Sequence, residues 1–288
     1  MKLLRNLSAA ILITLLTGQI AQSQNIQYGV KGGISLYFGD LAPAQNILSS
    51  ESRLCTGFFV KREFNDVLSI RVDASYLDIY GDDANSVEAW RTNRNLNFQS
   101  DVFEGSITAE LSPLAIRVGY GNNIQPYIGI GVGIFQFNPT TIYNGNVIEL
   151  QPLNTEGQGL EGLGTPYSLV QFNIPIQMGV QFNWSSGWNI SAELNYRKLF
   201  TDYLDDVSGY YVSNTLLSEN YGPISALLSD RSEGMINSSG DIPNLSVPRG
   251  NPTDYDAYAA LVLKVGYTID RIRTRNGYSR NKIGCPTF

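Results

Sequence analysis

Apolar and polar residues alternate with a period of two along most of the chain beyond its first two dozen residues. The longest run covers residues 170–184, where eight apolar side chains fall on one face and polar or small residues fall on the other. Alternation of this kind indicates a β-strand with one apolar face. A strand of about 9–11 residues crosses the hydrocarbon core of a bilayer, so this run is long enough to span a membrane.

Further runs share this alternation, and together they give eight predicted strands. These are residues 26–38, 54–64, 68–80, 101–111, 124–138, 168–184, 188–200 and 256–268. The links after the second and sixth strands are short, the link after the fourth is of medium length, and the other links are longer. Outer-membrane barrels have short turns in the periplasm and long loops outside the cell. We therefore predict an all-β fold: an eight-stranded antiparallel transmembrane β-barrel in the outer membrane, with long extracellular loops and both termini in the periplasm.

A soluble β-sandwich is the alternative, because its strands alternate in the same way. The aromatic residues near the strand ends favour the barrel, since aromatic girdles flank the lipid-facing band of outer-membrane barrels. These residues are Tyr28, Phe64, Tyr76, Trp184, Trp188 and Tyr267.

The first 23 residues have the pattern of a signal peptide. Lys2 and Arg5 precede a mostly apolar stretch, and Ala21 and Ser23 are the small residues that a signal peptidase reads. The apolar stretch is too short and too interrupted to cross a bilayer as a helix, which needs about 20 apolar residues. We predict a signal peptide at residues 1–23, a barrel at residues 24–268 and a C-terminal tail at residues 269–288.

The same alternation places nine charged side chains on the inner face of the predicted strands. They are Lys31, Lys61, Arg71, Arg197 and Lys264 together with Asp73, Glu104, Glu110 and Glu193. Eight strands enclose an interior just wide enough for side chains to fill, and buried charges need partners. This near-balanced set predicts a lumen plugged by a charge network; a narrow channel is the alternative.

The net charge is −6, and the chain contains no histidine. An acidic chain is a poor candidate for binding nucleic acid, which selects basic surfaces. Histidine is the usual general base and a member of catalytic triads. We therefore predict no enzymatic activity, no cofactor and no small-molecule substrate.

Three loop segments need a separate interpretation. Residues 157–162 match the dinucleotide-binding fingerprint by letter, but they lie in a polar loop instead of between a strand and a helix, so we predict no such site. Asp202, Asp205 and Asp206 could bind calcium through carboxylate oxygens. Because their spacing does not match an EF-hand loop, we predict a solvated shoulder beside the strand. Residues 223–228 could form a short helix that starts at a proline.

The predicted tail is basic in an otherwise acidic chain. It contains Arg271, Arg273, Arg275, Arg280 and Lys282 against Asp270, which gives five minus one, or a net charge of +4. Basic segments attract acidic partners, although a solvated, disordered tail is common at chain ends. The two cysteines, Cys55 and Cys285, fall at opposite ends of the predicted barrel. We therefore expect no disulfide between them, since a disulfide requires Cα atoms within about 7 Å.

Several phrases in the loops and at the strand ends resemble, in order and spacing, the PorG-like outer-membrane barrels of Bacteroidota. They are RNLNF at 94–98, PY at 126–127 through FNP at 137–139, LQPLNTEGQG at 150–159, YRKLFTDYLDDVS at 196–208, LSDRS at 228–232, RGNP at 249–252 and CP at 285–286. The resemblance runs through nearly the whole chain after the predicted signal peptide.

This resemblance implies a role in protein secretion through the type IX secretion system. PorG-like proteins are associated with the periplasmic ring formed by the PorK lipoprotein and PorN, and are thought to tie that ring to the outer membrane. The resemblance identifies no ring-contacting residues. Our own hypothesis places this contact in the basic tail, including Cys285. The alternative is a surface barrel like OmpA or OmpX that binds ligands or host surfaces through its long loops.

Overall fold

The computed structural model describes residues 25–42, 51–119, 121–232 and 247–270. The predicted signal peptide and residues 271–288 of the predicted tail lie outside the described residues. Residues 269 and 270, which we assigned to the tail, belong to the last strand.

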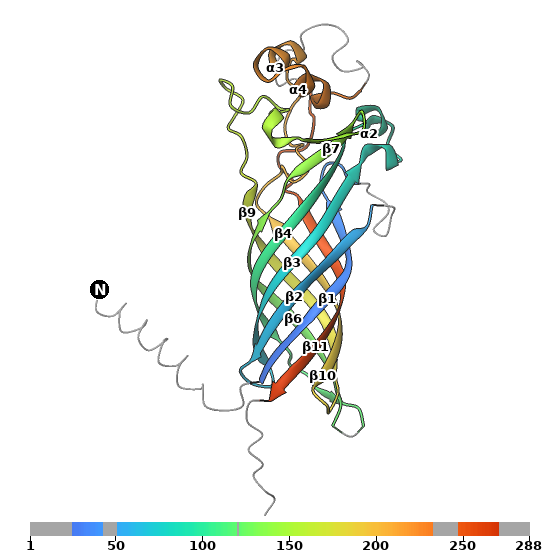
Figure 1. Ribbon diagram of the computed structural model, residues 1–288, viewed down its shortest axis with the longest axis vertical. Helices are drawn as coiled ribbons and strands as arrows, with labels where there is room; N and C mark the ends of the chain where they lie inside the picture. Colours follow the sequence, from blue (N-terminus) through green and yellow to red (C-terminus); the bar gives the residue numbers. More distant parts are fainter. Residues whose placement is uncertain (1–24, 43–50, 120, 233–246, 271–288) are drawn as a thin grey trace, which may run out of the picture.

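Eight long antiparallel strands form a closed barrel, as predicted (Figure 1). They are β1 (Asn25–Phe38), β2 (Arg53–Glu63), β3 (Leu68–Asp82), β4 (Asn97–Leu111), β6 (Asn123–Gln136), β9 (Val170–Asn183), β10 (Trp188–Leu199) and β11 (Ala257–Asp270). Each strand pairs with the next in this order, and β11 closes the ring by pairing with β1 from Asn25↔Asp270 to Phe38↔Ala257. A single closed ring excludes the β-sandwich.

Short elements extend the barrel at both ends. They are β5 (Ile116–Arg117), β7 (Pro139–Tyr143), β8 (Asn146–Glu149), the 3-10 helices η1 (Asp83–Asn85) and η2 (Gln151–Leu153), and the helices α2 (Ala89–Arg94), α3 (Asn214–Tyr221) and α4 (Pro223–Ser229). The helix α4 confirms the predicted short helix. None of the helices in the described part of the chain has the length and apolar character needed to cross a membrane.

The two ends of the barrel differ. At one end, which we call the turn end, lie the short connections after β2 and β9, together with the start of β1 and the end of β11. The long connections lie at the opposite end, which we call the loop end, where they form a layer above the strands (Figure 1).

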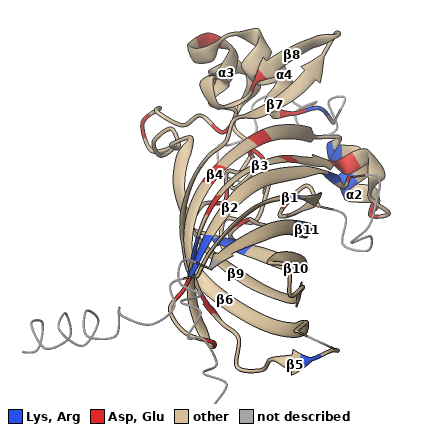
Figure 2. Cartoon of the chain, turned by 60° about the horizontal axis from the view of Figure 1, so that its bottom comes forward, with Lys and Arg blue, Asp and Glu red and all other residues tan. Residues whose placement is uncertain are grey.

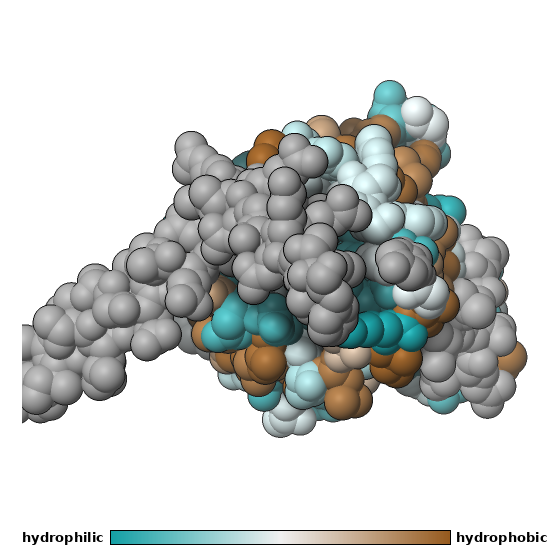
Figure 3. All heavy atoms as spheres, turned by 90° about the horizontal axis from the view of Figure 1, so that it is seen from below, coloured by the Kyte–Doolittle hydropathy of each residue, from teal (hydrophilic) through white to brown (hydrophobic). Residues whose placement is uncertain are grey.

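The outer wall of the barrel is apolar over most of its height. Many of the apolar side chains that alternate outward along the strands are at least half exposed, among them Phe58, Val72, Phe103, Ile130, Val132, Phe172, Met178 and Leu263. Figure 3, seen from the turn end, shows apolar side chains gathered on the outer flank. Trp184 and Trp188 lie beside the turn between β9 and β10, and Trp188 packs against Tyr267 with ring centroids 5.4 Å apart. A closed barrel with such a belt satisfies its backbone polar groups internally and is the form in which strands cross lipid.

Towards the loop end the polarity of the wall reverses. On β3 and β4 the inward side chains become apolar, with Leu77 and Phe98 fully buried, while Asp78 and Asp101 point outward. Water instead of lipid surrounds a wall of this kind, so its apolar side chains turn inward as they do in a soluble protein. The belt therefore ends on these strands near Phe103.

This reversal explains where the strand prediction was wrong. We predicted that the fourth strand begins at residue 101, whereas β4 begins at Asn97. The four added residues have the inverted pattern, so a search for apolar outward positions misses them. The hairpin of β7 and β8 was also missed, although its turn residues Asn144 and Gly145, both with positive φ, are a strong hairpin signal.

Candidate functional site

The nine charged side chains assigned to the lumen all lie inside the barrel and are buried. β3 contributes Arg71 and Asp73, and β4 contributes Glu104 and Glu110. The remaining five come from β1, β2, β10 and β11: Lys31, Lys61, Glu193, Arg197 and Lys264.

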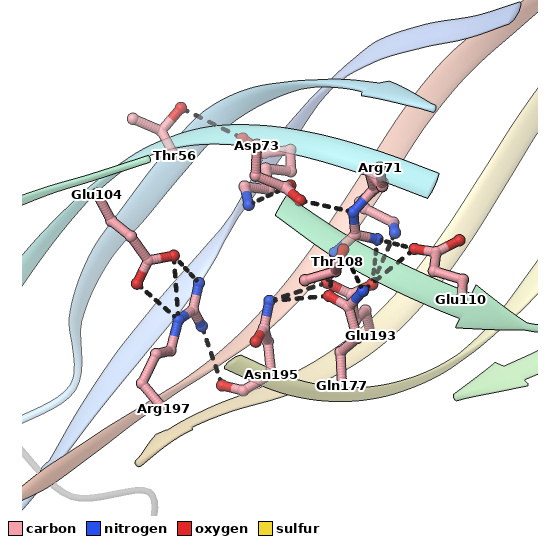
Figure 4. A network of polar contacts seen from close by, with 12 residues as sticks. Thr56, Arg71, Asp73, Glu104, Thr108, Glu110, Gln177, Glu193, Asn195 and Arg197 are labelled. Carbon is pink, nitrogen blue, oxygen red and sulfur yellow. Dashed lines mark hydrogen bonds and ion pairs between the residues drawn. The ribbon is translucent and has the colours of Figure 1, made fainter. Parts of the chain in front are cut away.

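Arg71 is the centre of the larger group of charges (Figure 4). Its Nε lies 2.7 Å from Asp73 Oδ2, and its Nη1 lies 2.6 Å from both Glu110 Oε1 and Glu193 Oε2. Its Nη2 donates to Glu193 Oε1 at 3.1 Å and also to Gln177. The guanidinium is fully buried. Its ion pairs with three carboxylates, two of which also accept its hydrogen bonds, offset the cost of removing its charge from water.

Three lysines complete this group. Lys264 Nζ lies 2.7 Å from Glu193 Oε2, which also accepts a hydrogen bond of 2.8 Å from the Tyr127 hydroxyl. Lys31 Nζ lies 2.7 Å from Asp73 Oδ1, and the other oxygen of that carboxylate contacts Arg71. Lys61 Nζ is 3.6 Å from the Glu110 carboxylate and donates to Gln181 at 3.0 Å. The charged members of this group therefore come from six strands and meet across the lumen.

A second, smaller group lies nearer the loop end. Arg197 Nε lies 3.1 Å from Glu104 Oε2, which also accepts hydrogen bonds from the Tyr258 hydroxyl at 2.6 Å and from Asn173 at 3.0 Å. Above it the interior becomes apolar, and the buried cluster there includes Phe98, Phe135, Phe137, Leu77, Ile79 and Leu204. Charged side chains thus fill the middle of the lumen, and apolar side chains fill its upper part.

The long loops form a third layer above the barrel, which we call the cap. It consists of the described residues 39–42, 51–52, 83–96, 137–169, 200–232 and 247–256. Figure 2 shows acidic and basic residues side by side around α2 in this layer.

Arg249 joins separate segments of the cap. Its Nη1 lies 3.0 Å from Glu156 Oε1 and donates to the backbone carbonyl of Asp206, while its Nε donates to the Ser229 carbonyl at 3.1 Å. The two carboxylate oxygens of Glu156 also accept the backbone N–H groups of residues 208 and 209 at 2.9 and 3.0 Å. Both side chains are buried, so this pair ties together loops that are far apart in the sequence.

Arg94 extends the network to the loop between β3 and β4. It makes a two-point contact with the Asp83 carboxylate, at 2.7 and 2.8 Å. Its Nη1 donates to the Arg249 carbonyl at 2.6 Å, and its Nη2 donates to the Asp40 carbonyl at 2.7 Å. One planar guanidinium therefore holds three loops in register.

The prediction that Asp202, Asp205 and Asp206 form a solvated shoulder was wrong. All three are at most 5% exposed, because the segment after β10 folds back over the top of the barrel instead of extending into water. Burial raises the pKa of Asp202 to about 7. Burial also raises the pKa of Asp206 to about 6, although the Arg249 charge opposes this shift. Among the described residues, no group of three or more His, Cys, Asp or Glu side chains is arranged to hold a metal ion.

The other loop and tail residues are placed as follows. Residues 157–162 lie in a series of turns before β9, with no helix after them, so the dinucleotide fingerprint lacks its structural context. Cys55 is buried in the apolar cluster as a free thiol. The proposed partner-binding residues Arg271, Arg273, Arg275, Arg280, Lys282 and Cys285 lie outside the described residues.

Sequence reasoning missed the charged residues of the cap. Arg94, Glu156 and Arg249 each stand in a loop phrase that carries the family resemblance, but nothing local indicates their partners. The only available signal was the presence of charges of both signs within the long loops.

The filled interior predicts that the protein does not conduct ions. Planar bilayers containing the purified barrel should show no steady single-channel steps in concentrated potassium chloride, because charged, apolar and cap side chains occupy successive levels of the lumen. A porin reconstituted in the same lipid is the positive control. Stable, reproducible steps from this barrel would show that the charge group leaves a continuous water path.

A family model described as a domain of unknown function (DUF6089) matches residues 5–225. No curated protein matches the sequence significantly. One similar solved structure is Ail, the attachment invasion locus protein of Yersinia pestis, in complex with a heparin analogue: 11% identity, coverage of 86% of this chain and 100% of that chain, TM-score 0.38. Another is OprG from Pseudomonas aeruginosa: 10% identity, 87% and 98% coverage, TM-score 0.37. A third is the outer membrane enzyme PagL: 12% identity, 85% and 99% coverage, TM-score 0.27.

Proposed function

The chain belongs to the DUF6089 family, and we propose that it is a non-enzymatic outer-membrane component of the type IX protein secretion system that ties the periplasmic PorK and PorN ring to the membrane. The observation that carries the proposal is the filled interior, from the charge group around Arg71 to the cap. A barrel without a pathway through it acts through its outer wall and its two ends. Binding a partner at one end is the simplest activity that remains.

The proposed orientation follows from the asymmetry of the connections. Short turns face the periplasm and long loops face outward in outer-membrane barrels. In the proposed orientation the cap lies outside the cell, and Asn25 and Asp270, which pair with each other, lie at the periplasmic face. The proposal thus puts both ends of the described barrel strands on the side of the periplasmic ring.

The proposed contact is the basic C-terminal tail, beyond the last strand. Its five cations would recognise an acidic surface of the ring proteins, as charge complementarity guides protein association. Deleting residues 271–288 spares β11 and is expected to leave the barrel folded. In a mild-detergent pull-down from native outer membranes, we expect the full chain to recover PorK and PorN and the deletion to lose them.

Two matched variants separate charge from chain length in this experiment. Replacing the five tail cations by glutamine should reduce recovery of the ring as strongly as the deletion does, whereas Cys285→Ser tests the thiol alone. If the deletion recovers the ring in full, the tail assignment is wrong. If the full chain also comes out alone after crosslinking, the secretion role itself is wrong.

A surface barrel that binds through its loops is the second candidate. One observation favours it: most phrases that carry the family resemblance fall in the cap, including those around Arg94, Glu156 and Arg249. Binding a ligand through an ordered cap costs less conformational entropy than binding it through flexible loops. Substitutions in the cap would then abolish binding to cells or ligands, while deletion of the tail would have no effect on it.

A further inference from the structure

A buried cluster of two carboxylates and one phenol lies where the cap meets the barrel. Tyr37 stands near the end of β1, Asp205 follows β10, and Asp256 directly precedes β11. The Tyr37 hydroxyl lies 2.6 Å from Asp205 Oδ2 and 3.1 Å from Asp256 Oδ1. The three side chains are at most 8% exposed.

The second oxygen of each carboxylate is already occupied. Asp205 Oδ1 accepts the Val207 N–H at 2.9 Å, and Asp256 Oδ2 accepts the Leu204 N–H at 2.9 Å. Within the described part of the chain, no lysine or arginine lies within ion-pair distance of either carboxylate. The two carboxyl groups therefore face each other across one hydroxyl without a cation to neutralise them.

The number of hydrogens in this cluster limits the hydrogen bonds that it can form. A phenol has one hydrogen to donate and can accept a second bond on its oxygen. Tyr37 can satisfy one carboxylate as a donor, and the other contact is a hydrogen bond only if that carboxyl carries a proton. Two carboxylates that share a site do not both ionise readily. Asp205 and Asp256 therefore hold one proton between them.

The surroundings favour retaining that proton. Burial raises the pKa of both carboxyls well above their usual range, and the Asp40 charge raises that of Asp205 further. The charges of Asp205 and Asp202 have the same effect on the pKa of Asp256. Arg94 faces Asp205 from the neighbouring loop and opposes this shift, but its hydrogen bonds go to Asp83 and to backbone carbonyls.

The cluster also fixes the position of the cap. Asp256 holds the N–H of Leu204, whose side chain is fully buried in the apolar cluster above the lumen. Gly39 leaves the space that this requires, since a Cβ there would lie only 1.9 Å from Asp256 Oδ1. Loss of the shared hydrogen bond would therefore loosen the segment that seals the top of the barrel.

We propose that Asp205, Tyr37 and Asp256 form a proton-dependent latch, in which one shared proton fastens the cap to the rim of the barrel and alkaline conditions release it. Loss of the proton leaves two facing carboxylates and a single donor. The cap then opens around residues 201–209 while the strands below remain paired. The latch does not depend on the proposed secretion role.

The sign of the pH effect follows from proton binding. Between the usual aspartate value of 3.8 and its raised value, the closed cap binds more protons than the open cap. The cap therefore becomes less stable as pH rises through this window. Asp202 and Asp206 act in the same direction, but their pKa values of about 7 and 6 confine most of their effect to lower pH.

Hydrogen exchange of the reconstituted full chain tests the latch. We expect exchange of residues 201–209, corrected for the intrinsic pH dependence, to rise by up to about tenfold per pH unit above about pH 7.5, until the shared proton is lost. Asp256→Asn mimics the protonated carboxyl and should make the corrected rates nearly independent of pH. Asp254→Asn, an exposed carboxyl two residues away, should behave like the wild type.

Asp205→Asn serves as a second variant if Asp256→Asn does not fold, and the same flat profile is expected of it. A wild-type profile that is flat above this pH would overturn the latch whatever the variants do. So would a folded Asp256→Asn protein whose cap still opens with pH as the wild type does.

Discussion

Replacing Glu193 by alanine is expected to lower the free energy of unfolding of the barrel by about 3–5 kcal/mol, the usual cost of removing one partner from a buried ion pair. Glu193 accepts two hydrogen bonds from Arg71 and lies 2.7 Å from Lys264 Nζ. Arg71 keeps Asp73 and Glu110 as partners, but Lys264 loses its carboxylate in a site that water reaches poorly. Urea unfolding of the barrel in lipid vesicles, followed by tryptophan fluorescence, measures the loss.

Two variants distinguish the charge from the loss of side-chain volume. Glu193→Gln keeps the shape and removes the charge, so it should cost nearly as much as alanine. Leu194→Ala, on the outward face of the same strand, leaves no buried charge without its partner, so it should cost much less. A Glu193→Ala barrel as stable as the wild type would mean that water enters the lumen and solvates Arg71 and Lys264.

The barrel could be predicted because its signal is local. Each strand repeats every two residues, and a lipid-facing side chain such as Ile130 or Phe172 must be apolar whatever its neighbours are. The same rule placed Arg71 and Glu193 inside. Their pairing could not be predicted, because it depends on how the strands are staggered around the ring. A shift of about two residues in register would keep the same side chains inside but change their partners.

The cap could not be predicted, because its contacts are remote in sequence and follow no period. Glu156 and Arg249 are 93 residues apart, and Arg94 reaches the Arg249 carbonyl across 155 residues. Asp205 looked like a surface residue because its partner Tyr37 lies 168 residues away. A search for apolar outward positions also assumes that one solvent surrounds the whole strand. It fails on β4 before Phe103, where lipid gives way to water.

This change of solvent divides the molecule into two parts with opposite rules. Along most of its height the barrel has polar side chains inside and apolar side chains outside. At the loop end it has an apolar interior and a polar exterior. The cap is thus built like a small soluble domain on a membrane barrel, and we expect the two parts to respond separately to substitution.

Arg249→Met tests this separation and is expected to open the cap without unfolding the barrel. Methionine fills much of the space, but it leaves Glu156 buried without its cation, a change that typically costs about 3–5 kcal/mol. A protease added to the reconstituted protein should then cut within residues 200–256 and leave a trimmed barrel that still runs as a compact species on unheated gels.

Arg117→Met, at the turn end, removes an exposed cation and should leave the cleavage pattern unchanged. The double variant Arg249→Met/Glu156→Gln should recover part of the resistance, because it removes the unpaired charge while the single carbonyl oxygen of the glutamine can still accept one of the two N–H groups of residues 208 and 209. If Arg249→Met instead unfolds barrel and cap together, the cap is part of the fold of the barrel and not a separate unit.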